Sequence, residues 1–525
     1  MIKLLGKNLD TRLITLSLTF AFIYLCLFNS VVFSYKFGYY KVTFFKAILE
    51  LTKDAVYIYL FTFIIFLGLT IQRLVFIIGT ILLFITGAVA SYYLYYFKIS
   101  PTKEMMGSVF STHFNELYEI ISIKLLLWLG FSLFICIYPI KYFSFANSKL
   151  FSHKLLSAVC LLITINNIFI PQFKLLCQYF PLQYLHNSYL YLSMNSKIAA
   201  SHENINQKFS FIDKADNNLI VVLVIGESAR FDHFGINGYS KDTTPYLRKI
   251  NNLFSFKAQS ASNHTYLSVP SLLSRYSSRD LDKSLDETSF LSVFTSLGFN
   301  THWLGTQTLL QYLKGKKQST IYDEVQFVMI PGGSALLKMN DYDGKMLPYI
   351  EQFVEAKTEK KLLVVHTSGS HWNYSARYPK EFRKFTPGCN QVAKSDPSTC
   401  GIEGLINDYD NSILYTDFFL FSLVELLKNN NAFLIYVSDH AESLGENGYY
   451  GHGGPLIPEQ TTIPLIVWVS DLFKMRHPNL VKAIKTHLGS ELSHDYIFHS
   501  ILDCAGIQSK GINKNLSICE KQRNG

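Results

Sequence analysis

An unbroken apolar run, Leu219-Ile-Val-Val-Leu-Val-Ile225, leads directly into Gly226-Glu227-Ser228. Two later runs have the same form: Leu362-Leu-Val-Val365 ends at His366, and Phe433-Leu-Ile-Tyr-Val437 ends at Ser438-Asp439-His440. Short apolar runs of this kind are typical of buried strands in a parallel sheet. Ligands bind beyond the carboxyl ends of such strands, so the polar residues that follow the runs are expected to share one crevice. These residues are Glu227, Asp439, His440 and either His366 or His371.

This set of residue types is suited to metal chemistry on phosphate esters. Such chemistry needs oxygen and imidazole ligands, and a nucleophile whose proton the metal helps to remove. Glu227, Asp439 and His440 provide the ligands. The nucleophile should be a hydroxyl at a helix start, where exposed backbone N–H groups favour phosphate. The stretch around Thr265 offers several hydroxyls, and any of them could instead cap the helix: Ser262, Thr265, Ser268 and Ser271.

The part of the chain before Pro171 has the composition of a membrane protein. The whole sequence is 49% hydrophobic, and the excess is concentrated in this part. Five stretches are about long enough to cross a hydrocarbon core: Leu13 to Phe33, Ala55 to Ile71, Leu74 to Phe97, Ile120 to Ile140 and Leu155 to Ile170. The first is too long for a signal peptide and lacks a small-residue cleavage site. We therefore expect a transmembrane domain with five helices.

Basic residues predict the orientation of these helices, because Lys and Arg are retained on the cytoplasmic side. With the amino terminus inside, three cytoplasmic segments carry them: Lys3, Lys7 and Arg12; Arg73; and Lys141, Lys149 and Lys154. The opposite loops are also basic, so the bias is modest. Five spans place everything after Pro171 across the membrane.

Four cysteines in the polar region support that placement. Cys389, Cys400, Cys504 and Cys519 form two close sequence pairs, as expected in an oxidising compartment. Four cysteines allow three connectivities, and the pairing of Cys389 with Cys400 and of Cys504 with Cys519 closes two short local loops. The formal net charge of +9 does not indicate nucleic-acid binding, because the basic residues are scattered and no nucleic-acid motif is present.

The chain is predicted to have three parts. Residues 1–171 form the transmembrane domain, residues 172–216 a linker along the membrane surface, and residues 217–525 a periplasmic catalytic domain. In the last part, strand-like runs alternate with amphipathic helices, near Ser289 to Leu297 and Asn411 to Leu427, which is typical of an α/β domain. The amphipathic loop from Pro101 to Glu116 should lie on the same side as the catalytic domain, either as an interfacial helix or as a lip that holds a lipid head group.

Several motifs in the catalytic part resemble those of a known family. They are Gly226-Glu227-Ser228-Ala229-Arg230-Phe231-Asp232-His233, Thr243-Thr244-Pro245, Thr265 upstream of Ser268-Val269-Pro270, His366-x-x-Gly369-x-His371, Tyr409-Asp410-Asn411-Ser412, and Ser438-Asp439-His440-Ala441-Glu442-Ser443 leading to His452-Gly453. Together they resemble the membrane-bound phosphoethanolamine transferases of Gram-negative bacteria. The resemblance covers nearly the whole chain and implies an alkaline-phosphatase or sulfatase-like fold in the soluble domain.

The resemblance also implies a mechanism. Zinc would be bound by Glu227, Thr265, Asp439 and His440. Thr265 would attack phosphatidylethanolamine in the inner membrane, release diacylglycerol and hold phosphoethanolamine, which lipopolysaccharide then accepts. Three histidines would contact the phosphate or a second metal: His366, His371 and His452. His366 could equally be a residue that supports the ligands without touching the metal.

The acceptor and the donor contacts are less strongly implied. The region after His366 and the carboxyl-terminal cysteines favour the branch that modifies the Kdo sugar, with lipid A as the other possibility. Thr112 and Glu116 match donor head-group contacts of the lipid A branch, but Ser108 replaces an Asn. Lys314 is offset from that branch's phosphate-binding Lys.

Phosphoethanolamine addition would weaken the attraction of cationic peptides to the cell surface, so polymyxin tolerance is expected. The alternatives are a phosphoglycerol transferase or a sulfatase-like hydrolase, although Ser268-Val269-Pro270-Ser271-Leu272 lacks the sulfatase Arg.

Overall fold

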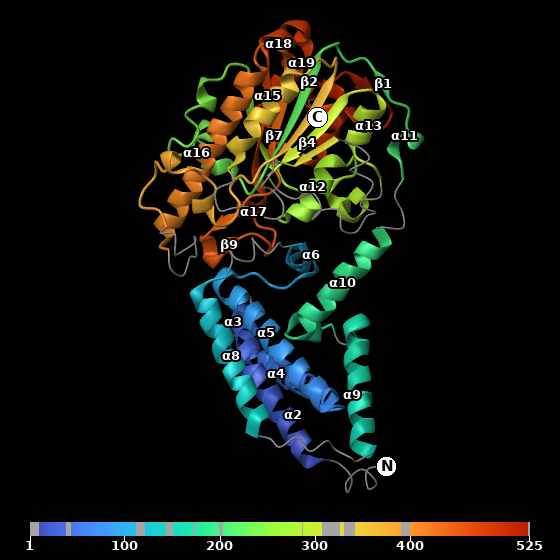
Figure 1. Ribbon diagram of the computed structural model, residues 1–525, viewed down its shortest axis with the longest axis vertical. Helices are drawn as coiled ribbons and strands as arrows, with labels where there is room; N and C mark the ends of the chain where they lie inside the picture. Colours follow the sequence, from blue (N-terminus) through green and yellow to red (C-terminus); the bar gives the residue numbers. More distant parts are fainter. Residues whose placement is uncertain are drawn as a thin grey trace. The chain divides into compact units, whose positions relative to one another are not determined.

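A computed structural model describes most of the chain (Figure 1). The described residues are 10–37, 44–111, 121–142, 151–171, 174–198, 203–285, 287–306, 326–329, 342–389 and 400–522. They fall into two compact units. One lies within Met1–Val109 and Ile121–Ser193, and the other within Phe110–Ile120 and Met194–Gly525.

The first unit is built from long apolar helices. Within the described residues, five helices are long and apolar enough to cross a membrane, which confirms the sequence prediction. The first span consists of α2 (Thr11–Tyr24), a π-helical turn (Leu25–Asn29) and α3 (Ser30–Phe37). The other four are α4 (Phe44–Leu69), α5 (Arg73–Phe97), α8 (Ile123–Tyr142) and α9 (Phe151–Phe169). Two further helices of this part of the chain are α6 (Lys103–Ser111) and α10 (Leu182–Ile198).

Polar side chains buried in this unit connect the spans to the segment that follows the fifth one. Asn29, in the π-helical turn, donates to the Phe180 carbonyl oxygen and accepts from the Phe180 N–H, both at 2.9 Å. The Tyr179 hydroxyl donates to Asp54 Oδ2 at 2.5 Å. Lys36 Nζ lies 3.9 Å from the same oxygen and 3.9 Å from the centre of the Tyr179 ring. These contacts fix the start of α10 on the helices of this first unit, which we call the membrane unit.

An eight-stranded mixed sheet forms the centre of the second unit, in the order β11-β3-β10-β7-β2-β6-β4-β5. Its strands are β2 (Leu219–Gly226), β3 (Leu253–Gln259), β4 (Asn300–Gly305), β5 (Gln326–Met329), β6 (Lys361–His366), β7 (Asn431–Ser438), β10 (Thr462–Val469) and β11 (Glu491–Ser493). β10 runs antiparallel to both β7 and β3, whereas the other neighbouring strands are parallel. The three apolar runs seen in the sequence are thus the central strands β7, β2 and β6, which confirms the α/β prediction.

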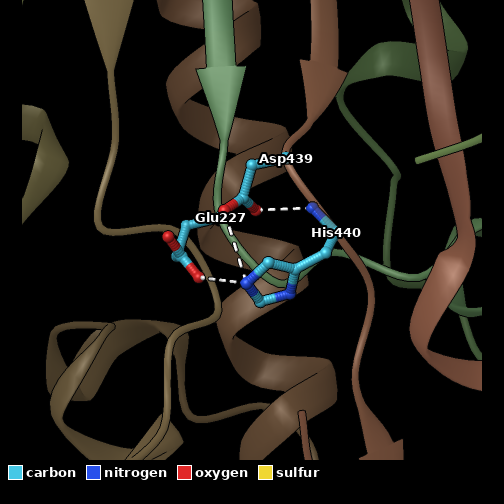
Figure 2. Close-up of side chains that lie close together, drawn as sticks. All are labelled: Glu227, Asp439 and His440. Carbon is cyan, nitrogen blue, oxygen red and sulfur yellow. Dashed lines mark hydrogen bonds and ion pairs between the residues drawn. The ribbon is translucent and has the colours of Figure 1, made fainter. Parts of the chain in front are cut away.

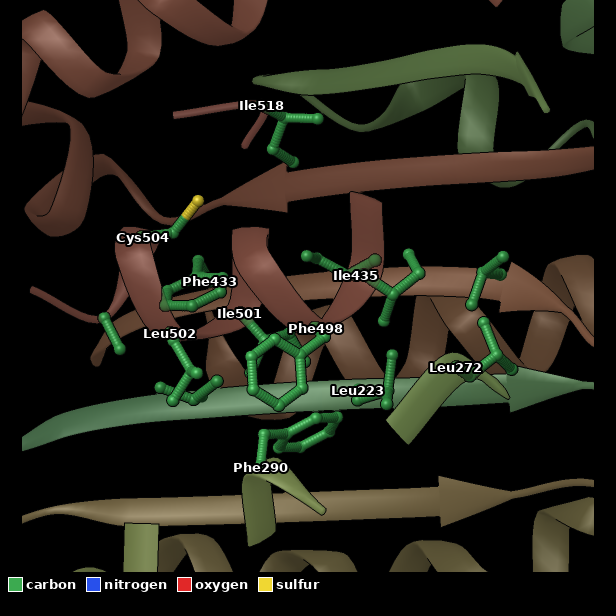
Figure 3. Close-up of a cluster of buried hydrophobic side chains, with 14 of the residues drawn as sticks. Leu223, Leu272, Phe290, Phe433, Ile435, Phe498, Ile501, Leu502, Cys504 and Ile518 are labelled. Atoms are coloured by element: carbon green, nitrogen blue, oxygen red, sulfur yellow. The ribbon is translucent and has the colours of Figure 1, made fainter. Parts of the chain in front are cut away.

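Helices cover both faces of this sheet (Figure 1). On one face, α12 (Thr265–Leu273), α13 (Phe290–Ser296) and α20 (Asp495–Cys504) enclose the core shown in Figure 3, where Leu272, Phe290 and Phe498 meet Leu223 and Phe433. Helices α15 (Leu347–Glu355) and α16 (Ile402–Leu427) lie along the other face. The smaller elements are α11 (Ile205–Lys208), α17 (Pro458–Thr461), α18 (Asp471–Arg476), α19 (Pro478–Thr486), β1 (Ile212–Asp213), β8 (Ser443–Leu444), β9 (Tyr450–Gly451) and β12 (Ile507–Gln508).

Helix α16 begins at Ile402 rather than near Asn411, where the sequence suggested a start. Its first turns carry buried polar residues, which interrupt the apolar periodicity. Asp408 accepts hydrogen bonds from the Tyr378 hydroxyl at 2.6 Å and the Cys389 N–H at 2.9 Å. The polar character of this stretch therefore reflects hydrogen bonding inside the fold and not exposure.

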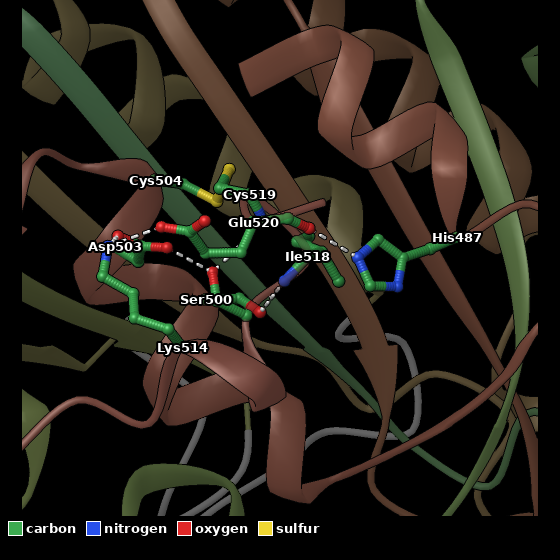
Figure 4. Close-up of a disulfide and its surroundings, with 9 residues drawn as sticks. His487, Ser500, Asp503, Cys504, Lys514, Ile518, Cys519 and Glu520 are labelled. Carbon is green, nitrogen blue, oxygen red and sulfur yellow. Dashed lines mark hydrogen bonds and ion pairs between the residues drawn. A yellow bond between two sulfur atoms is a disulfide. The ribbon is translucent and has the colours of Figure 1, made fainter. Parts of the chain in front are cut away.

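Both predicted disulfides are present, Cys389–Cys400 and Cys504–Cys519. The second joins the end of α20 to the carboxyl-terminal segment (Figure 4). Around it, the Ile518 N–H donates to Ser500 Oγ at 3.0 Å. Cys504 and Cys519 are buried among the core residues, so this bridge also contributes apolar packing.

Candidate metal centre and nucleophile

Three potential metal ligands meet where β2 and β7 end (Figure 2). The two strands are parallel and pair Gly226 with Ser438, so Glu227 and Asp439 leave the sheet side by side. One ligand atom each from Glu227, Asp439 and His440 lies within 4.8 Å of the others. All three side chains are fully buried. We call these three residues the ligand group.

Hydrogen bonds hold the ligand group in place but leave acceptor atoms directed inward. Asp439 Oδ1 accepts the Ser228 N–H at 3.1 Å and the His440 N–H at 2.7 Å. Asp439 Oδ2 accepts no hydrogen bond from the described residues and lies 3.4 Å from His440 Nε2. His440 Nδ1 lies 3.0 Å from the Ala441 carbonyl oxygen, to which it must donate, so the Nε2 lone pair faces the two carboxylates. Two carboxylates and one imidazole lone pair around a buried point fit a divalent cation.

Burial sets the electrostatics of the ligand group. It raises the pKa of Asp439 to about 6, and it lowers the pKa of His440 to about 3. In both cases the cause is removal of the ionised form from water. A cation at this point would offset the cost of burying the Asp439 charge. The residues therefore suit a bound metal better than an empty cavity.

The loop after β6 supports Glu227 through its backbone. The Ser370 N–H donates to the Glu227 carbonyl oxygen at 2.9 Å. Gly369 has a φ of +47°, and a Cβ at this position would lie 2.8 Å from that same oxygen. A side chain at Gly369 would therefore displace the backbone of a ligand residue.

Thr265 brings a hydroxyl to the ligand group. It is the first residue of α12, and its Oγ1 lies 3.1 Å from His440 Nε2 and 3.4 Å from Glu227 Oε2. Two of the three competing hydroxyls make hydrogen bonds elsewhere. Ser262 Oγ accepts the His264 N–H at 3.2 Å, and Ser268 Oγ donates to the Thr265 carbonyl oxygen at 3.4 Å. Buried Ser271 Oγ has no hydrogen-bond partner among the described residues. The geometry therefore favours Thr265 over the other three candidates.

Further histidines surround this centre. The His452 ring lies 4.2 Å from that of His440, 6.1 Å from that of His371 and 6.4 Å from that of His264. His452 Nδ1 and Glu442 Oε1 are 3.1 Å apart. Burial alone would lower the pKa of His452, but the hydrogen bond and charge of Glu442 outweigh it and raise the pKa. His452 is thus the imidazole most ready to carry a positive charge beside the ligand group.

Comparison with known proteins agrees with this geometry. The sulfatase family model matches residues 220–507. The chain belongs to the sulfatase family. The model of the phosphoethanolamine transferases EptA/EptB matches residues 59–192, most of which belong to the membrane unit. The combination confirms the resemblance found in the sequence, to membrane-bound phosphoethanolamine transferases with a sulfatase-like domain.

Individual relatives give the same result. A Kdo(2)-lipid A phosphoethanolamine 7''-transferase of Salmonella typhimurium is 30% identical over 60% of this chain and 56% of its own length. Phosphoethanolamine transferase EptA of Escherichia coli is 27% identical over 82% of each chain. In fold, the chain resembles the solved lipooligosaccharide phosphoethanolamine transferase A of Neisseria meningitidis, with a TM-score of 0.79, 23% identity and coverage of 98% and 99% of the two chains.

The remaining predicted residues of this sulfatase-family chain lie apart from the ligand group or outside the described residues. His366 ends β6, is fully buried and packs edge-on against Trp303 at 5.9 Å between ring centres. It is not part of the ligand group. Ser108 lies in α6. Thr112, Glu116 and Lys314 fall outside the described residues, so their roles stay predictions.

Three residues near the site were not singled out from the sequence. His264 immediately precedes Thr265, and Glu442 is two residues after His440, so this proximity in the sequence was the available signal. Asp343 had no such signal, because it stands far from every motif. Its carboxylate accepts the Ser368 N–H at 2.8 Å and the Gly369 N–H at 3.0 Å. Asp343 thereby orders the loop that supports Glu227.

Proposed function

We propose that this protein transfers phosphoethanolamine from phosphatidylethanolamine to lipopolysaccharide, with Thr265 as the nucleophile. The single observation that carries the proposal is the position of the Thr265 hydroxyl. It stands at the amino-terminal end of α12 and contacts both His440 and Glu227 of the ligand group. Exposed N–H groups at a helix start favour an approaching phosphate.

Transfer takes place in two displacements. The bond between Thr265 Oγ1 and phosphorus forms as the phosphorus–oxygen bond to diacylglycerol breaks; the hydroxyl proton is lost, and the departing oxygen gains a proton. The acceptor oxygen then attacks the same phosphorus, and Thr265 regains its hydroxyl. We assign contact with the phosphate oxygens in both steps to His452, which Glu442 holds, and to His371; the His452 ring lies close to the rings of both His440 and His371, which supports this assignment.

Zinc is the metal we assign to the ligand group. The donor set of two carboxylates, one imidazole and the Thr265 hydroxyl has the composition and number of a four-coordinate zinc site. When bound there, zinc would lower the pKa of a coordinated hydroxyl and neutralise charge that develops on the phosphoryl group. Removal of zinc with a chelator should abolish transfer, and added zinc should restore it.

The acceptor we favour is the Kdo sugar of the inner core, with lipid A as the other candidate. Some support comes from a relative whose name includes Kdo(2)-lipid A and which is 30% identical over 60% of this chain, although relatives named phosphoethanolamine transferase EptA are equally similar. The five apolar helices and the two disulfides support a bacterial inner-membrane protein whose second unit, which we call the catalytic unit, lies in the periplasm. Cells that carry the modification should tolerate polymyxin better, because the added amine reduces the negative charge of the surface.

Mass spectrometry of lipopolysaccharide tests the proposal. Cells would express the wild type, Thr265→Ala or the matched control Ser268→Ala, which removes a buried hydroxyl from the same helix. We expect phosphoethanolamine on the core fragment from the wild type and from Ser268→Ala, and none from Thr265→Ala. Phosphoethanolamine on lipid A would keep the mechanism and overturn the Kdo choice. Full activity of Thr265→Ala would overturn the nucleophile, and no modification in any strain would favour phosphoglycerol transfer or hydrolysis.

A further inference from the structure

His494 lies between the two chain segments that deliver the nucleophile and the metal ligands. It follows β11, is fully buried, and its N–H donates to the Gln259 carbonyl oxygen at 3.1 Å, at the end of β3. Its ring contacts the loop that leads from β3 to Thr265 on one side and the end of β7 on the other. None of the sequence motifs includes this residue.

Both ring nitrogens of His494 are bonded to backbone groups. Nδ1 lies 3.1 Å from the Ala261 nitrogen, and Nε2 lies 3.0 Å from the Ser438 carbonyl oxygen. An amide N–H can only donate and a carbonyl oxygen can only accept. The ring must therefore be neutral, with its proton on Nε2. A proton on Nδ1 would face the Ala261 N–H, and burial separately lowers the pKa of His494 to about 4.

We propose that His494 is a positioning residue that joins the Thr265 loop to the Asp439-His440 segment and so sets the geometry between nucleophile and ligand group. Ala261 lies four residues before Thr265, and Ser438 immediately precedes Asp439. One rigid ring fixes both segments, so displacement of either end changes the 3.1 Å contact between Thr265 Oγ1 and His440 Nε2. His494 touches neither the substrate nor the metal in this scheme.

Two other hydrogen bonds hold the loop before Thr265. Ser260 N–H donates to the Thr461 carbonyl oxygen at 2.8 Å, and the Asn263 side chain donates to Gln460 Oε1 at 2.6 Å. Both contacts lead to the segment before β10. The Gln460 carbonyl oxygen also accepts the Ala441 N–H at 3.0 Å, so this segment reaches the ligands indirectly. The Ala261 contact with His494 links the loop to the end of β7 through a single side chain. A change at His494 should therefore alter the relative position of the two parts of the site without removing either.

Two substitutions of His494 test its hydrogen bonds to Ala261 and to Ser438 separately. In His494→Asn the amide oxygen can take the place of Nδ1 and keep the Ala261 link, but nothing reaches Ser438. In His494→Gln the amide nitrogen can take the place of Nε2 and keep the Ser438 link, but the Ala261 N–H loses its acceptor. The matched controls are His499→Asn and His499→Gln. His499 is also buried, on α20, and its Nδ1 accepts the Asn513 N–H at 3.1 Å, away from the site.

The experiment uses the full-length zinc-loaded protein in detergent and has three readouts: diacylglycerol release from phosphatidylethanolamine, zinc retention against a chelator, and hydrogen exchange of residues 256–264. Both His494 variants should lose about 10- to 100-fold in kcat with KM for the lipid nearly unchanged. His494→Gln should show faster exchange in residues 260–264, and His494→Asn should release zinc faster while exchange in that segment stays near the wild-type rate. The His499 variants should change none of these.

The measurement of diacylglycerol release rests on the proposed function, whereas hydrogen exchange and zinc retention do not depend on it. If the wild type releases no diacylglycerol, the proposed function fails, and exchange and zinc retention still decide the role of His494. If both His494 variants match their His499 controls in exchange and zinc retention, His494 is a structural residue and the inference is overturned. Equal losses of kcat in the His494 and His499 variants, with equal losses of thermal stability, would also overturn it.

Discussion

Buried polar groups serve different ends in the two units of this chain. In the membrane unit, Asp54 pairs with the Tyr179 hydroxyl and with Lys36, while Asn29 pairs with both backbone groups of Phe180. In the catalytic unit, Asp439 Oδ2 is equally buried but accepts no hydrogen bond from the described residues. Buried acceptors that are paired within the protein hold a fold together, whereas a buried carboxylate oxygen without a donor, beside two further potential ligands, indicates a place for a cation.

The largest effect is expected from a substitution of Asp439, because its carboxylate belongs to the ligand group whereas that of Asp54 is paired within the protein. Asp439→Asn should abolish zinc binding and lower transfer by more than about 100-fold, beyond the usual effect of a residue outside the ligand set. Without zinc, the same change should stabilise the protein at pH 8. The pKa of Asp439 is raised to about 6, so its ionised form destabilises the fold above that pH, by at most about 3 kcal/mol.

Thermal unfolding in a chelator at pH 8 and at about pH 3 checks the sign of this effect. Well below the unfolded pKa of about 3.9, the carboxyl is protonated in both folded and unfolded chains, so the variant and the wild type should unfold alike. A metal-free Asn variant that is less stable than the wild type at pH 8 would place Asp439 with the structural carboxylates. The comparison between the two units would then fail.

Asp54→Ala should destabilise the membrane unit by about 3 kcal/mol, because the Tyr179 hydroxyl and Lys36 lose a buried partner. Thermal unfolding in detergent measures this change. The double variant with Tyr179→Phe should cost clearly less than the two single changes added together, since both remove the same hydrogen bond. Zinc content should not change. Strict additivity would show that Asp54 and Tyr179 act independently.

Removal of either disulfide should lower the stability of the catalytic unit without changing the ligand group. Replacing Cys504 and Cys519 with Ala should cost about 3 kcal/mol, the value expected for a closed loop with a sequence separation of 15 residues. Replacing Cys389 and Cys400, with a separation of 11, should cost slightly less. Denaturant unfolding of the wild type and the two double variants measures both losses. A larger loss for the Cys389 pair would mean that its bridge supports more structure than its loop length indicates.

Asp343→Asn gives the smallest expected effect. Asp343 is buried in the catalytic unit, but it accepts three hydrogen bonds, from Thr306 Oγ1 and the backbone of Ser368 and Gly369. It should therefore behave like Asp54 and not like Asp439: a stability loss of about 1 to 2 kcal/mol, unchanged zinc content and transfer reduced less than about 10-fold. Loss of zinc would instead show that the loop it orders is part of the metal site.

The amino-acid sequence was sufficient for features that depend on regular patterns. Five long apolar stretches predicted the spans, and three apolar runs predicted the central strands β7, β2 and β6. Because these strands are parallel neighbours, their carboxyl ends meet, so the strand pattern was enough to group Glu227, Asp439 and His440. The disulfide pairing followed from short sequence separations.

Features that depend on tertiary contacts could not be predicted in this way. Asp343 and His494 belong to no motif, and most of their partners are backbone groups far away in the chain. The start of α16 was misplaced, because its buried polar residues resemble a surface loop in sequence. The choice of Thr265 among four hydroxyls needed the family resemblance, since only the fold determines which side of α12 faces the ligands.

The close approach of Gly369 to the Glu227 backbone has an evolutionary consequence. A methyl group there would meet the Glu227 carbonyl oxygen at 2.8 Å, although Gly369 itself lies outside the ligand group. In a library of all single substitutions, this glycine should tolerate replacement as poorly as the three residues of the ligand group. New substrate preferences should therefore arise by drift in side chains and not by change in the backbone beneath the ligand group.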